Sequence, residues 1–249
     1  MRTENGVHEM GGQQKAHPGT AVFFFLAKPS NPYIMIIKTK RKEGSFMARL
    51  NQAENDILPL SALSHPICFV VDMVNGFVKE GALHDAAILD LCAPISALIE
   101  KLQCRTVFVA DSHPPMTREF TAYPQHCVIG SGEDEVIEEL RPYIHQLIRK
   151  NSTNTFFAPD FQRLLEEELH GYREIIITGC CTDICIMQFA LTLNAWLNEH
   201  NHTDKRVIVP LDCVDTYHIE GVHDASACNA FAIANMKGNG ILVPSSIQE

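Results

Sequence analysis

The stretch "REIIITGCCTDIC", residues 173–185, carries the pattern that decides the fold. It opens with a β-branched run, residues 173–179, which is typical of a strand buried on both faces of a sheet. The pair Thr182 and Asp183 is a helix-capping signal, and the segment 183–201 that follows is helix-like. A buried strand that leads directly into a helix is the building unit of α/β proteins.

The same alternation of apolar runs and amphipathic segments continues on both sides of this stretch. Further strands are predicted by the apolar runs 67–72, 105–111, 206–212 and 240–244, and the ambiguous segment 143–150 is a candidate for one more. Helices are predicted at 84–103, 159–171 and 223–238. Strand–helix–strand repeats require right-handed crossovers. We therefore expect an α/β protein: a three-layer α/β/α sandwich with a mainly parallel, Rossmann-like central sheet.

The composition is that of a globular protein with one sizeable core, because 46% of the 249 residues are hydrophobic. Thirty acidic and twenty basic side chains give a formal net charge of −10, which repels nucleic-acid phosphates and anionic membrane surfaces. We expect a small-molecule partner, with no nucleic acid and no membrane. Residues 21–38 hold two apolar runs, but polar residues and prolines divide them, and neither reaches the ~20 residues of a spanning helix.

The first 46 residues differ in pattern from the rest of the chain. We interpret 1–46 as an N-terminal extension and 47–249 as the folded domain. Met47 opens the helix-compatible segment "MARLNQAENDILPL", so a start at Met47 is an alternative. The extension and the predicted helix 183–200 are candidate contacts for a homo-oligomer.

The nine cysteines do not follow the spacing of a disulfide framework, and their number is odd. We therefore expect reduced thiols in a cytoplasmic protein. A structural zinc site would need two C-x-x-C pairs, whereas Cys181 and Cys185 are separated by three residues and have no second pair. Most of the nine are expected to be small buried apolar residues.

Polar residues gather where the predicted strands end. Asp72, Asp111 and Lys150 each end or follow an apolar run, and Cys180 to Cys185 follow the run 173–179. In open parallel sheets, ligands bind outside the carboxyl ends of the strands, so these side chains are expected to share one site. A thiol, a carboxylate and an ammonium group are what cysteine catalysis requires.

Among the three neighbouring cysteines, Cys185 is the better candidate nucleophile. It follows the capping pair, in the first turn of the predicted helix, where free N–H groups are expected to lower the pKa of its thiol. Cys180 and Cys181 continue the strand and are expected to shape the turn.

The motif "GCCTDIC" after a buried strand resembles the cysteine signature of the isochorismatase-like hydrolase superfamily. The resemblance spans roughly 65–244 and implies that Cys185 is the nucleophile, Asp72 the general base and Lys150 the active-site lysine. It also implies a cis peptide bond between Cys180 and Cys181. The oxyanion donors implied by the resemblance are the backbone N–H groups of Cys181 and Cys185.

A second motif, "DSHPPMTREFTAYPQHC" (111–127), supplies candidate metal ligands: Asp111, His113, Glu119 and His126. Two imidazoles with carboxylates suit one divalent ion, with Zn²⁺ the first expectation and Mn²⁺ or Fe²⁺ as alternatives. The alternative for each histidine alone is a loop residue that caps a turn. The layout resembles the nicotinamidase/pyrazinamidase branch of the superfamily, whose metal binds the pyridine nitrogen of the substrate. Glu119 stands where some relatives have a histidine.

The resemblance implies hydrolysis of nicotinamide to nicotinate and ammonia through a thioester, as a step of NAD salvage. Phe77 and Tyr123 are the candidate apolar walls for the ring. The segment "DMVNGF" (72–77) departs from the D-x-Q-x-D-F pattern of many nicotinamidases at Asn75 and Gly76. Alternatives are a metal-free cysteine amidase, another isochorismatase-like hydrolase, or a non-catalytic member of the fold.

Overall fold

The computed structural model describes residues 56–249, so the predicted extension 1–46 and the alternative start at Met47 lie outside the described residues. The main sheet has six strands in the order β4-β3-β2-β5-β6, with β7 paired to β5, and every pair is parallel. The strands are β2 (Pro66–Val71), β3 (Arg105–Asp111), β4 (Gln146–Lys150), β5 (Glu174–Cys180), β6 (Arg206–Ile208) and β7 (Val214–Asp215). A second, two-stranded parallel sheet joins β1 (Ile57–Pro59) to β8 (Ser246–Gln248).

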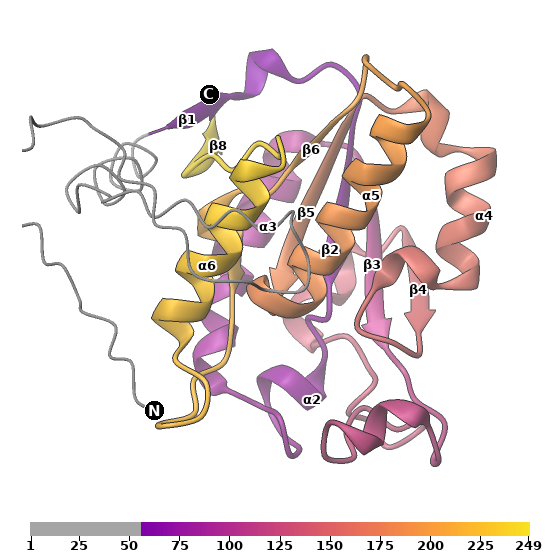
Figure 1. The fold of residues 1–249 in the computed structure, drawn as a ribbon, viewed down its shortest axis with the longest axis vertical. Helices are drawn as coiled ribbons and strands as arrows, with labels where there is room; N and C mark the ends of the chain where they lie inside the picture. Colours follow the sequence, from indigo (N-terminus) through magenta and orange to yellow (C-terminus); the bar gives the residue numbers. More distant parts are fainter. Residues whose placement is uncertain (1–55) are drawn as a thin grey trace, which may run out of the picture. The chain divides into compact units, whose positions relative to one another are not determined.

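Helices cover both faces of the main sheet (Figure 1). One face packs against α4 (Pro159–Glu167), α5 (Met187–Glu199) and α6 (Ala225–Gly238). The other packs against α2 (Asn75–Val78) and α3 (Cys92–Leu102). Alternate residues of β2 point to opposite faces of the sheet: Phe69 packs in the core under α4, α5 and α6, and Val70 packs in the core under α2 and α3. The predicted three-layer α/β/α sandwich is confirmed.

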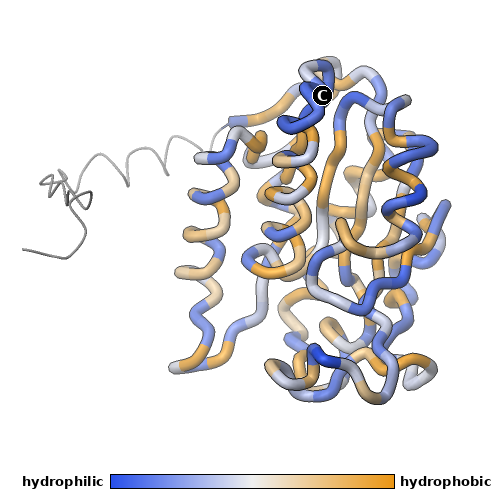
Figure 2. Tube along the Cα trace, turned by 45° about the vertical axis from the view of Figure 1, so that its right-hand side comes forward, coloured by the Kyte–Doolittle hydropathy of each residue, from blue (hydrophilic) through white to orange (hydrophobic). Residues whose placement is uncertain are grey.

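The central strands are apolar along their length because both faces are buried, as the hydropathy colouring in Figure 2 shows. By contrast, α4 is amphipathic, with Phe161, Leu164 and Leu165 buried against the sheet. No helix among residues 56–249 combines the length and the apolar character needed to cross a membrane.

Two predicted strands differ in the structure. The run 206–212 forms a strand only as far as Ile208, because Pro210 has no N–H to continue the ladder. The run 240–244 forms no strand: Leu242 makes a single parallel bridge to Ile208, between Gly240 at φ 85° and Pro244. The ambiguous segment 143–150 does yield a strand, β4.

The predicted helices also break at their ends. The segment 84–103 divides into a 3-10 helix (Ala86–Leu91) and α3, and the segment 159–171 ends as a 3-10 turn (Leu169–Gly171) after α4. The segment 183–201 begins with a π-helical turn (Thr182–Ile186) before α5. In the helix-compatible segment 47–60, the described part is strand β1 and the start of a 3-10 helix (Leu60–Ala62).

Candidate active site

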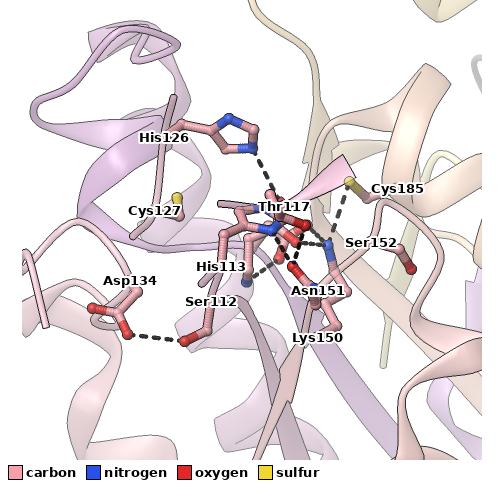
Figure 3. A network of polar contacts seen from close by, with 12 residues as sticks. Ser112, His113, Thr117, His126, Cys127, Asp134, Lys150, Asn151, Ser152 and Cys185 are labelled. Carbon is pink, nitrogen blue, oxygen red and sulfur yellow. Dashed lines mark hydrogen bonds and ion pairs between the residues drawn. The ribbon is translucent and has the colours of Figure 1, made fainter. Parts of the chain in front are cut away.

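The predicted thiol, carboxylate and lysine meet at the carboxyl ends of three strands. Asp72 follows β2, Lys150 ends β4, and Cys185 lies in the π-helical turn after β5. The Lys150 Nζ atom lies 3.8 Å from Cys185 Sγ (Figure 3). The same atom lies 2.8 Å from Asp72 Oδ2. All three side chains are buried. The structure thus brings together the three residues that the sequence singled out.

The backbone at the strand ends fixes the position of Asp72. This residue has a φ of 55°, a left-handed conformation that turns its side chain out of the strand direction. Its Oδ1 atom accepts a hydrogen bond of 3.0 Å from the N–H of Asp111. Gly179 on the neighbouring strand has a φ of 104°, and a Cβ there would lie 2.0 Å from the carbonyl oxygen of Val71. Only glycine permits this approach of β5 to β2.

The buried charges hold one another in defined protonation states. Burial raises the pKa of Asp72 to about 6, although the charge of Lys150 opposes the rise. Burial alone would lower the pKa of Lys150, but Asp111 and Asp72 hold it well above its usual value. Burial acts to raise the pKa of Asp111, but the charge of Lys150 together with the nearby imidazoles of His113 and His126 outweighs burial and keeps this pKa low. Lys150 and Asp111 are thus both charged near neutral pH.

The protonation of Cys185 differs from the sequence-based expectation. Burial raises the pKa of its thiol well above the usual value, and the carboxylates of Asp72 and Asp111 raise it further, against the charge of Lys150. The prediction that a helix N-terminus lowers this pKa is wrong, because desolvation outweighs the effect of the backbone dipoles. The resting thiol therefore keeps its proton, and its reaction needs a proton acceptor.

The four candidate metal ligands also come together. Asp111, His113, Glu119 and His126 each offer a ligand atom, and these atoms lie within 4.8 Å of one another. Asp111 Oδ2 lies 3.6 Å from His113 Nε2 and 3.8 Å from His126 Nε2. Asp111, His113 and His126 are buried. Glu119 is half-buried and lies in a 3-10 helix (Arg118–Thr121).

The ring orientations of the two histidines show which nitrogens are free. His113 Nδ1 lies 2.8 Å from Asn151 Oδ1, and His126 Nδ1 lies 2.7 Å from the carbonyl oxygen of Pro124. Because both partners are acceptors, each Nδ1 carries the hydrogen and each Nε2 presents a lone pair. His113 Nε2 is buried and has no hydrogen-bond partner among the described residues. Lone pairs and carboxylate oxygens that converge in this way fit a divalent cation.

One cavity connects the Cys185 thiol to three of the four candidate ligands, all except His113. It opens to solvent, and its lining includes Asp111, Glu119, His126 and Cys185. Phe77 and Tyr123 line it as predicted, with their ring centroids 5.6 and 6.1 Å from that of His126. Sequence reasoning missed the remaining lining residues: Leu83, Thr153, Ile184 and Tyr217. No motif marks them, because three lie in turns or loops whose path depends on tertiary contacts.

Comparison with known proteins bears on this arrangement. Residues 66–239 match the Isochorismatase domain family. The chain belongs to the isochorismatase family. Nicotinamidase 1 of Arabidopsis thaliana is 29% identical to this family member over 166 residues, which are 59% of the chain and 65% of the plant protein. The chain thus spans less than two thirds of that relative.

Solved structures of other proteins share the isochorismatase fold. N-carbamoylsarcosine amidase from Thermoplasma acidophilum superposes with a TM-score of 0.57 at 25% identity, covering 73% of this chain and 96% of that one. PnC1 from L. infantum, solved in complex with nicotinate, has a TM-score of 0.62 at 21% identity over 78% and 100% of the two chains. The pyrazinamidase of Pyrococcus horikoshii, solved with zinc, has a TM-score of 0.57 at 23% identity over 72% and 98%.

The turn before Cys185 has the geometry that the family resemblance implied. The peptide bond between Cys180 and Cys181 is cis. Cys181 and Cys185 both line the cavity, which is where oxyanion-binding amides would be needed. Cys180 is buried instead, and its thiol donates to the carbonyl oxygen of Asp72 at 3.2 Å.

The departure "DMVNGF" is explained by packing against a neighbouring loop. Asn75 Nδ2 donates to the carbonyl oxygen of Gly132 at 2.9 Å. A Cβ at Gly76 would lie 2.7 Å from Cys127 Sγ, so only glycine lets this loop approach. The two residues hold α2 against the loop after His126, and Phe77 keeps its place in the cavity.

Proposed function

We propose that this protein is a metal-dependent cysteine amidohydrolase that converts nicotinamide to nicotinate and ammonia through a thioester. The observation that carries the proposal is the shared cavity, which has Cys185 at one side and Asp111, Glu119 and His126 at the other. A flat ring held by the second group would place its substituent toward the thiol. The likeness to Nicotinamidase 1 and to a protein solved with nicotinate supports the same substrate class.

The first half of the reaction forms the thioester. Asp72, with its pKa raised to about 6, is ionised at neutral pH and accepts the thiol proton of Cys185 as the sulfur attacks the carboxamide carbon. Lys150 lies within 3.8 Å of the sulfur and stabilises the negative charge that develops. The oxyanion faces the backbone N–H groups of Cys181 and Cys185, and loss of one such donor commonly costs about 10²–10³ in turnover.

The second half releases the acid. The C–N bond breaks, and protonated Asp72 gives its proton to the departing nitrogen, which leaves as ammonia. A water molecule then gives a proton to Asp72 and attacks the thioester carbonyl. The C–S bond breaks, nicotinate is released, and the proton returns from Asp72 to Cys185. Phe77 and Tyr123 flank the ring throughout.

Asp111, His113, His126 and Glu119 would hold one divalent ion, with Zn²⁺ the first expectation and Mn²⁺ or Fe²⁺ the alternatives. When bound, such an ion supplies a Lewis acid for the pyridine nitrogen and so orients the ring. We place the reaction in NAD salvage in the cytoplasm, in keeping with nine free thiols among the described residues.

An ammonia-release assay tests the proposal. Nicotinamide, pyrazinamide and benzamide are compared, with and without a chelator, and the bound metal is measured by elemental analysis. We expect turnover of the first two substrates, little turnover of benzamide, and loss of the preference on chelation. Equal hydrolysis of benzamide and nicotinamide, or no bound metal, would make the protein a metal-free cysteine amidase instead.

A further inference from the structure

We propose that Asp183, His223 and Cys228 form a second metal site, suited to Zn²⁺, that links the catalytic turn to α6. Asp183 lies in the π-helical turn, two residues before Cys185, and Cys228 lies near the start of α6. One ligand atom from each of the three residues lies within 4.8 Å of the other two. This site is separate from the ligands at the cavity and does not depend on the function proposed above.

The two polar contacts of the His223 ring indicate a positive charge between this ring and Asp183. Its Nδ1 atom lies 2.8 Å from the carbonyl oxygen of Tyr217, which can only accept, so Nδ1 carries a hydrogen. Its Nε2 atom lies 2.9 Å from Asp183 Oδ2. A lone pair and a carboxylate repel each other at this distance, so a positive charge must join them. That charge is a proton, held by the ring or by the carboxyl group, or a metal ion.

The third donor and the supporting bonds favour the metal ion. Cys228 adds a thiol, which a simple imidazolium–carboxylate pair does not need. Asp183 Oδ1 accepts a hydrogen bond of 2.6 Å from Thr216, and the ring of Tyr217 stacks on His223 with centroids 4.0 Å apart. Bonds of this kind orient ligands at metal sites. The side chains of Asp183 and His223 are 13% and 14% exposed, so an ion can enter from solvent.

The ligand types indicate which ion would bind. A carboxylate, an imidazole and a thiolate suit Zn²⁺, and three protein ligands leave a fourth position for water. Binding requires the Cys228 thiol to release its proton to solvent. The occupied site would restrain the turn that carries Cys185 and the cavity residue Tyr217, so we expect zinc there to change turnover as well as stability.

Cobalt titration of the full chain, stripped of metal with a chelator, tests this site. A thiolate bound to Co²⁺ gives a near-ultraviolet charge-transfer band, whereas the cavity ligands Asp111, His113, Glu119 and His126 contain no sulfur. We expect two equivalents of Co²⁺ per chain, one of which produces the band. Cys228→Ser should lose the band and one equivalent, and the matched control Cys92→Ser should keep both.

The variants also separate this proposal from the first one. His113→Ala combined with His126→Ala should lose one equivalent and keep the band. A wild-type chain without the band would overturn the second site, and so would a band that survives in Cys228→Ser and disappears in Cys185→Ala. If circular dichroism shows that Cys228→Ser does not fold, His223→Asn provides the same test, since it removes a ligand without touching a thiol.

Discussion

The two sides of the cavity are built in different ways. The thiol side takes Asp72, Lys150 and Cys185 from the ends of three strands, and the pairing of the sheet sets their positions. The metal side takes its four candidate ligands from a single segment, 111–126, and a hydrogen bond from the His113 N–H to the carbonyl oxygen of Cys127 folds this segment back on itself. The thiol side should therefore tolerate changes in the loops, whereas the metal side should be sensitive to them.

Asp111 joins the two sides. It ends β3 opposite Lys150 in the sheet, and its Oδ1 atom forms an ion pair with the lysine amine. Its Oδ2 atom faces the Nε2 atoms of His113 and His126. A charge added or removed on one side therefore acts on the other, and removing one residue at a time measures how far the two sides depend on each other.

Removing the Cys185 thiol, the proposed nucleophile, should have the largest effect. We expect Cys185→Ala to lower nicotinamide hydrolysis by about 10³-fold or more, since no other thiol at the cavity lies beside the lysine. Cys180→Ala and Cys181→Ala should keep measurable activity. Ammonia release by purified variants is the measurement, with Cys92→Ala as the control. Substantial turnover by Cys185→Ala would remove the thioester from the mechanism.

Removing Lys150 should lower stability as well as turnover. Its amine lies 2.8 Å from Asp72 in the buried site, and Lys79 lies the same distance from Glu139 on the surface. We expect Lys150→Met to lower the free energy of unfolding by about 3–5 kcal/mol, because two buried carboxylates lose their cation. The matched Lys79→Met should cost about 0–1 kcal/mol. Urea denaturation at pH 7 compares the two, and equal costs would contradict the buried ion cluster.

The sequence predicted the thiol side more completely than the surrounding cavity. Runs of β-branched residues mark strands that are buried on both faces, so the strand ends and the residues just after them could be located. The metal side could be predicted from a compact motif within one segment. Tyr217 and Leu83 could not, because each reaches the cavity from a turn whose path is set by contacts far away in sequence.

The protonation state of Cys185 shows a different limit of sequence analysis. A position after a helix-capping pair indicates a lowered thiol pKa, but the degree of burial cannot be read from the local pattern. The strand predicted at 240–244 failed for a related reason. Ile241 and Val243 are buried as alternate residues of a strand would be, but only the exposed Leu242 forms a bridge to β6.

Removing both histidines should affect the metal side more than the thiol side. We expect His113→Ala combined with His126→Ala to lose the ion and to raise KM for nicotinamide by about 10²-fold. Loss of a residue that only supports a metal ligand typically costs about 10–100-fold in metal affinity or activity, and loss of the ligands themselves should cost at least as much. Labelling of Cys185 by iodoacetamide should be retained, because the sheet holds the thiol side. Elemental analysis, kinetics and labelling are measured on the same sample. His84→Ala, at an exposed histidine, is the control.

Asn151 tests whether loop bonds position the metal side. Its Oδ1 atom accepts from His113 Nδ1, and also from Thr117 Oγ1 at 3.0 Å. Asn151→Ala should free the His113 ring and weaken metal affinity by about tenfold, with little change in unfolding free energy. Thr117→Val removes the neighbouring bond only and should leave affinity nearly unchanged. Competition with a chromogenic chelator measures both, and equal affinities in the two variants would mean that Asn151 does not orient the ring.

The pH dependence of turnover should show the smallest change and separates the two carboxylates. Asp72 accepts a proton only when ionised, and its pKa is raised to about 6, so kcat/KM should be half-maximal near pH 6 and fall toward lower pH. Asp111 has a lowered pKa, so its contribution to stability is complete above its ordinary value of 3.8 and is lost only below it. Loss of activity between pH 7 and 5 is therefore not caused by unfolding that follows protonation of Asp111.

We expect the midpoint of kcat/KM against pH to be the same with nicotinamide and pyrazinamide, and the circular dichroism spectrum to be unchanged over this range. A midpoint that moves with the substrate would assign the titration to the substrate.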